Sequence, residues 1–190
     1  MSTALRAFAV AVAYLVAARY AVVLQDLGGL SAVFWPGAGV TVAGLLLSPR
    51  HMWPAIVVGV GSAELANNLL AGFALVPSLG WALANVVEQT TAAWLIQRWK
   101  AEGFASVRAA GWFIVAAVAA SVIGAGIGSL ATSVYVSPQP YLVTAGQWMI
   151  GDALGILTVA PFGLLLFGRF PAARLRSFEG VMAMFGSPPG

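Results

Sequence analysis

The sequence lacks cysteine, has a single histidine and carries few charged residues. Without cysteine, the chain can form neither a disulfide nor a thiolate metal site. One histidine cannot supply a two-histidine cofactor site, and His51 follows Arg50 in a turn that is typical of a membrane interface. We therefore expect no metal and no cofactor.

The shortage of charge excludes a water-soluble domain. Lys, Arg, Asp and Glu make up 8% of the 190 residues, whereas a soluble domain has about 25%. Hydrophobic residues make up 61%, so the chain is interpreted as a polytopic membrane protein. It is too short for a membrane bundle and a separate enzyme domain, and it has no Walker loop or nucleophile elbow. We expect no enzyme activity.

The apolar stretches predict an all-α bundle of six membrane-spanning helices. The predicted spans are residues 5–24, 33–47, 52–70, 76–99, 109–135 and 147–167. At 1.5 Å per residue, each can cross a hydrocarbon core of about 30 Å, although the second is short.

The basic residues alternate between the loops and so predict the orientation. Loops 25–31, 71–75 and 137–145 contain no Lys or Arg, and the positive charge lies at the other ends of the spans: Arg6, Arg50, Arg98, Lys100, Arg108, Arg169, Arg174 and Arg176. The positive-inside rule then predicts that both termini are cytoplasmic. The same rule explains the net charge of +3 without any nucleic-acid partner.

Both ends of the chain leave alternatives open. Arg6 and the apolar run 7–18 resemble a signal peptide, but apolar residues resume at 20–24 after Arg19, which favours a retained span. We assign residues 1–168 to the bundle. Residues 169–190 are expected to form a cytoplasmic tail, an interfacial helix or the start of a further, truncated span.

Four ionisable residues lie within the predicted spans: Arg19, Glu64, Glu88 and Asp152. Each costs roughly 2.5 to 3.5 kcal/mol in hydrocarbon, and such groups usually mark sites or pathways. Counting along the helices places all four between the midplane and the outer interface, so we expect one polar cluster. Either water reaches it or one acid is protonated, with Glu88 the candidate.

Polar and aromatic neighbours extend this candidate site. Asn67 and Asn68 follow Glu64 on one helical face, Asn85 precedes Glu88 by three residues, and Trp148 precedes Asp152 by four. The alternative for such residues is hydrogen bonding between helices, at about 0.6 kcal/mol per contact. Trp35 and Pro36 begin the second span beside two glycines. They are expected either to cover or floor a pocket, or to be an ordinary interfacial tryptophan beside helix-packing glycines. Gly124 and Gly128 form a GxxxG spacing that predicts close helix packing.

Several motifs, taken in order, resemble the MASE1 family of bacterial membrane-associated sensor domains. They are the segment 34–40 (Phe-Trp-Pro-Gly-Ala-Gly-Val), Trp53-Pro54, the segment 85–88 (Asn-Val-Val-Glu) and the segment 148–155, which contains Gly151-Asp152-Ala153. The resemblance covers roughly residues 31–166. Its motif positions include Trp35, Pro36, Asn85, Glu88 and Asp152.

The resemblance implies an input domain that is normally joined to a cytoplasmic histidine kinase, diguanylate cyclase or phosphodiesterase. MASE1 domains are usually described with about eight spans, and this sequence predicts six. We therefore expect a sensory module in the lipid bilayer that binds an unknown small ligand and acts on an output domain or other membrane chains. The alternatives are an accessory subunit of a membrane complex and a small proton-coupled transporter.

Overall fold

The computed structural model describes residues 2–28, 34–102, 106–136 and 139–167, and these residues form helices only. The helices are α1 (Thr3–Gly28), α2 (Pro36–Leu46), α3 (Trp53–Leu70), α4 (Leu75–Arg98), α5 (Val107–Tyr135) and α6 (Tyr141–Leu166). A short 3-10 helix, η1 (Arg50–Met52), precedes α3. The expected all-α class is confirmed, and the predicted tail at 169–190 lies outside the described residues.

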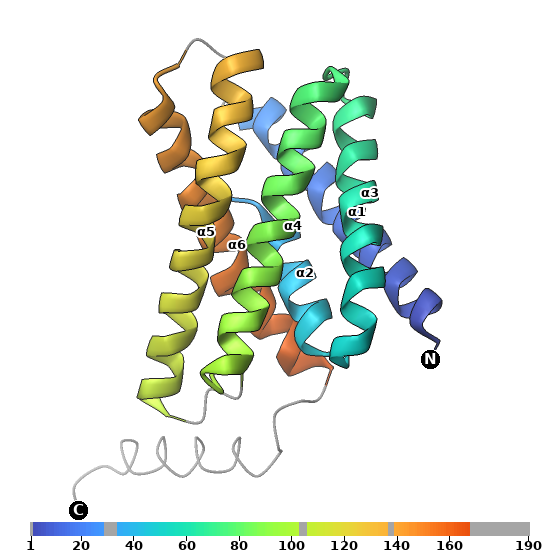
Figure 1. The fold of residues 1–190 in the computed structure, drawn as a ribbon, viewed down its shortest axis with the longest axis vertical. Helices are drawn as coiled ribbons and strands as arrows, with labels where there is room; N and C mark the ends of the chain where they lie inside the picture. Colours follow the sequence, from blue (N-terminus) through green and yellow to red (C-terminus); the bar gives the residue numbers. More distant parts are fainter. Residues whose placement is uncertain (1, 29–33, 103–105, 137–138, 168–190) are drawn as a thin grey trace, which may run out of the picture.

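The short helix α2 lies at the centre of the bundle (Figure 1). It packs against α1, α3, α4 and α6, while α3, α4, α5 and α6 also pack on their neighbours around it. Nine of its eleven residues are buried. The α3–α4 turn and the end of α5 lie at one end of the bundle, opposite η1 and the end of α6 (Figure 1).

As a helix, α2 is shorter than the predicted second span. Its 11 residues extend about 16 Å, roughly half of a hydrocarbon core. Pro36 fixes the first turn because its ring suits that position and it has no N–H to leave unpaired. The preceding residue, Trp35, is non-helical, and its backbone N–H donates to the carbonyl of Gly151 in α6 at 3.0 Å.

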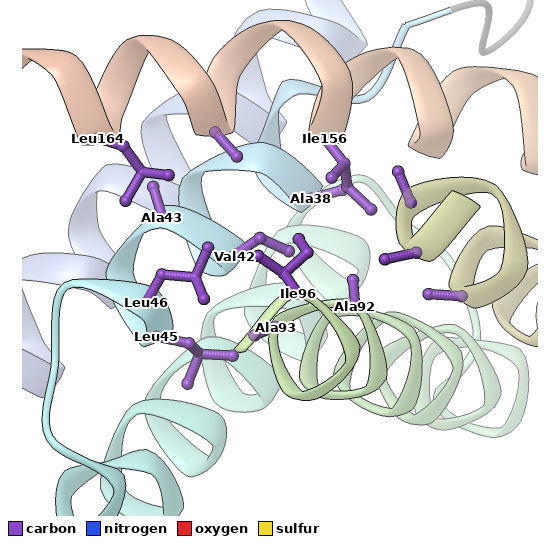
Figure 2. Close-up of a cluster of buried hydrophobic side chains, with 14 of the residues drawn as sticks. Ala38, Val42, Ala43, Leu45, Leu46, Ala92, Ala93, Ile96, Ile156 and Leu164 are labelled. Atoms are coloured by element: carbon purple, nitrogen blue, oxygen red, sulfur yellow. The ribbon is translucent and has the colours of Figure 1, made fainter. Parts of the chain in front are cut away.

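The apolar core is built around the C-terminal half of α2. Figure 2 shows Val42, Leu45 and Leu46 of α2 facing Ile96 of α4, with Leu164 of α6 on the other side of α2. All five side chains are fully buried. Alanines at positions 38, 43, 92 and 93 fill the space between them, which allows the backbones to approach closely.

The outer surface of the bundle is apolar. Large hydrophobic side chains are exposed on all of the peripheral helices, among them Phe8, Val58, Leu83, Val122 and Phe162. Among the described residues, α1 within Thr3–Val23, α5 and α6 are long and apolar enough to cross a membrane. Helices α3 and α4 are not among these because their polar residues lower the mean hydropathy. Their lengths of 18 and 24 residues would nevertheless extend about 27 and 36 Å.

Two glycines allow α2 and α6 to cross at close range. A Cβ atom at Gly155 would overlap the carbonyl oxygen of Trp35 and lie 2.7 Å from its carbonyl carbon. A Cβ atom at Gly39 would overlap the carbonyl oxygen of Gly155 and lie 3.0 Å from the backbone nitrogen of Ala160. Backbone atoms cannot rotate away, so only glycine fits at both positions.

We predict that Gly155→Ala destabilises the fold by about 2 kcal/mol or more, because the new methyl group would force α6 away from α2. Gly146→Ala on the same helix is the matched control, since no atom lies within 4 Å of its Cβ position. There the gain in helix propensity, up to about 1 kcal/mol, should dominate. Thermal unfolding in detergent measures both variants, and equal melting temperatures would contradict the crossing.

Candidate functional site

Glu64 is a buried carboxylate with neutral hydrogen-bond donors on three helices. It lies on α3 and is 2% exposed. Its Oε1 accepts from Nδ2 of Asn68 at 3.0 Å and from Nδ2 of Asn85, on α4, at 3.2 Å. Its Oε2 accepts from the hydroxyl of Tyr14, on α1, at 2.9 Å. These three bonds replace the hydration that the carboxylate loses in an apolar interior.

The hydrogen-bond network extends from Glu64 to the start of α2 and into α4. The indole N–H of Trp35 donates to the hydroxyl of Tyr14 at 3.3 Å. The ring of Tyr14 packs against Gly37, where a Cβ atom would lie 2.8 Å from Cε2 of the ring. On α4, Nε2 of Gln89 donates to Oδ1 of Asn85 at 3.3 Å. The network therefore joins α1, α2, α3 and α4.

A second pair of acids lies beside this network. Glu88 on α4 is fully buried, and Asp152 on α6 is 3% exposed. Their carboxyl groups lie within hydrogen-bonding reach of one another. The hydroxyl of Ser121, on α5, donates to Oε1 of Glu88 at 2.9 Å, while Oε2 of Glu88 and Oδ2 of Asp152 find no donor among other residues. A hydrogen bond between two carboxyl groups requires a proton on one of them.

Asp152 lies deeper in the bundle than the sequence predicts. The sequence places the start of this span near residue 147, about one and a half turns before Asp152. The helix begins instead at Tyr141, immediately after Pro140, so Asp152 is about 16 Å from its start. This depth brings Asp152 level with Glu88, and it is why the two carboxyl groups meet.

A cavity of about 250 Å³ opens beside both sets of acids. It lies toward the end of the bundle that carries the α3–α4 turn, because Ala71 and Phe73 of that turn line it. The rings of Phe73 and Trp81 meet edge to face, with centroids 4.9 Å apart and an interplanar angle of 87°. The lining includes six of the predicted site residues: Trp35, Glu64, Asn67, Asn85, Trp148 and Asp152.

Three predicted residues are not part of the cavity lining. Glu88 lies behind it, against Asp152. Pro36 is buried in the first turn of α2. Arg19 is exposed on α1, and its predicted membership of the cluster is not supported. Tyr14 and the neighbouring buried Ala18 define the inner face of α1, and Arg19 is rotated about 140° from Tyr14 on that helix.

A comparison with protein families identifies the family of this chain. The family model for MASE1 matches residues 5–181, which is nearly the whole chain. The chain belongs to the MASE1 family. The expected resemblance is thus confirmed, and MASE1 is a family of membrane-associated sensory domains. The comparisons with curated proteins and with solved structures returned no match.

The two glycines of the GxxxG spacing make room for candidate site residues in this MASE1 domain. A Cβ atom at Gly124 would lie 2.8 Å from Cβ of Glu88, and one at Gly128 would lie 2.7 Å from ring atoms of Trp148. The predicted close packing is present. Its consequence is chemical as well as structural, because α5 is thereby able to cover Glu88 and hold the Trp148 ring at the cavity.

Sequence reasoning missed several residues that contribute to this candidate site. Tyr14, Ser121 and Trp81 were not predicted, although each makes a hydrogen bond there: to Glu64, to Glu88 and, for the indole of Trp81, to Oγ1 of Thr132 at 2.9 Å. Of these three residues, only Tyr14 could have been predicted from the sequence. A tyrosine within an apolar span needs a partner for its hydroxyl, and acids were the available acceptors.

We predict that Ser121→Ala lowers the free energy of unfolding by about 1 kcal/mol, because Oε1 of Glu88 loses its donor while the helix backbone is unchanged. Ser62→Ala on the exposed face of α3 is the control and should be neutral. Equilibrium unfolding in mixed micelles compares the two. Identical stabilities would show that the Ser121 bond contributes nothing.

Proposed function

We propose that this MASE1 domain is the ligand-binding input module of a bacterial signalling protein, with the cavity beside Glu64 and Asp152 as its sensory site. The observation that carries this proposal is the position of α6. Trp148 and Asp152 line the cavity, and the same helix runs on to Leu166 at the opposite end of the bundle. A helix of this length can connect a ligand site with an output domain.

The orientation follows from the distribution of charge. Arg50, Arg98 and Lys100 lie at the end of the bundle that carries η1 and the end of α4, whereas the α3–α4 turn contains no basic residue. The positive-inside rule assigns the basic end to the cytoplasm of the inner membrane. The cavity then faces the periplasmic side, and α6 ends on the cytoplasmic side, where a kinase or cyclic-di-GMP output domain would receive the signal.

A ligand can change this bundle only through different affinities for two helix arrangements. The cavity supplies groups for such a difference, because its walls come from five helices besides the Trp35 segment. A ligand that contacts Asp152 on α6 and Glu64 on α3 would favour one spacing of these helices. The resulting shift of α6 is the proposed signal.

Because the sequence contains no cysteine, single introduced cysteines can be labelled to test the orientation of the bundle in the membrane. We predict that Ala74→Cys, in the α3–α4 turn, reacts with a membrane-impermeant maleimide in intact spheroplasts. Val107→Cys is the matched site at the basic end, with 92% of its side chain exposed, and it should react only after permeabilisation. The reverse pattern would overturn the assignment of the cavity to the periplasmic side.

The signalling role is tested in a chimera that joins this chain to a diguanylate cyclase. We expect Asp152→Asn and Glu88→Gln to change cyclic-di-GMP output several-fold, because both alter the acid pair that links α4 to α6, while membrane expression is kept. Glu102→Gln, beyond the end of α4, is the control. Wild-type output from both site variants would count against a sensor and favour an accessory subunit. A proton-driven flux in proteoliposomes would favour a transporter.

A further inference from the structure

The ionisable side chains of the cavity lining are all acidic. Two carboxyl groups line it, and no Arg, Lys or His is among the lining residues. Several neutral donors of the lining already have protein partners: Asn68 and Asn85 donate to Glu64, Trp35 donates to Tyr14, and Trp81 donates to Thr132. An anionic ligand would therefore meet two acidic side chains and no basic one to balance its charge.

Asn67 provides independent evidence that a donor is missing. Its side chain is 1% exposed, it lines the cavity, and its Oδ1 has no hydrogen-bond partner. An unpaired buried polar atom is costly, so it is retained at a functional position more readily than at a structural one. The atom is buried in the wall of the cavity, and a ligand N–H group that reached it would complete its hydrogen bonding.

The aromatic walls favour the same chemistry. Trp35, Trp81, Trp148 and Phe73 surround the space, and the faces of aromatic rings, of tryptophan above all, attract cations. A carboxylate accepts about four hydrogen bonds and Glu64 accepts three, so one site remains. Together with Asp152 and Oδ1 of Asn67, this gives three acceptors, which match the three N–H donors of a primary ammonium group.

We propose that the cavity binds a small organic ammonium ion, held by Asp152, Glu64 and Asn67 and enclosed by the tryptophan rings. This inference rests on the proposed function, since it names the ligand class of the same site. The cavity volume of about 250 Å³ lies below the roughly 300–1,000 Å³ of drug-sized sites, so the ligand is a compact amine.

The test titrates the purified full chain in lipid nanodiscs with propylammonium, 1-propanol and propionate, at matched ionic strength, and follows tryptophan fluorescence. We expect a saturable response to propylammonium only. Asp152→Asn should weaken it at least about tenfold, because it replaces a carboxyl oxygen of the lining with an amide nitrogen that cannot accept from the ammonium group. Glu102→Gln removes an acid outside the lining and should leave the response unchanged.

Asn67→Leu separates a binding role from a structural one. Because Oδ1 has no protein partner, the substitution should leave the melting temperature unchanged or raise it, while weakening propylammonium binding about five- to tenfold. This variant keeps the test decisive if Asp152→Asn fails to fold.

Two results would overturn the proposal: no saturable response to propylammonium, or wild-type affinity in both Asp152→Asn and Asn67→Leu. A saturable response to propionate or 1-propanol alone that these substitutions abolish would also overturn the ammonium assignment, yet it would leave a ligand site in place. The proposed sensory function itself fails only if the cyclase chimera is insensitive to the acid substitutions, so the two failures are distinguishable.

Discussion

The structure depends on the hydrogen bonding of one carboxylate, Glu64, which has no adjacent cation among the residues that the structure describes. Water cannot solvate an acid in an apolar interior, so the protein must supply donors. Tyr14, Asn68 and Asn85 do so from α1, α3 and α4. Because each donor is neutral, the network can hold the acid without neutralising it. The same acid also lines the neighbouring cavity.

The remaining helices are arranged around this constraint. The central helix α2 begins at Pro36, and Trp35 before it contacts both Tyr14 and the backbone of Gly151. Close approach at Gly39 and Gly155 fixes α6 against α2, which places Asp152 against Glu88. The cavity lies where these two groups of polar residues face each other. The cavity is thus built on rigidly packed helices, which hold its polar side chains in fixed positions.

Helix positions and site residues were predictable to different degrees. Apolar length predicted α3, α4 and α5 to within two residues at each end, because hydrophobicity alone defines such helices. The start of α6 was placed six residues late, and the depth of Asp152 was wrong for that reason. The sequence did not predict which face of α1 is buried, that is, the rotation of this helix about its own axis. That helix is apolar on every side, so nothing in its pattern separated the buried face of Tyr14 from the exposed face of Arg19.

The most direct measurement of the central claim is a double-mutant cycle between α1 and α3. Tyr14→Phe, Glu64→Met and the double variant are unfolded reversibly in mixed micelles, and their coupling free energy is obtained. A shared buried hydrogen bond predicts a favourable coupling of about 1 kcal/mol, within the range measured between membrane helices. Additive effects of the two substitutions would show that Tyr14 does not hold the Glu64 carboxylate, and would contradict the account.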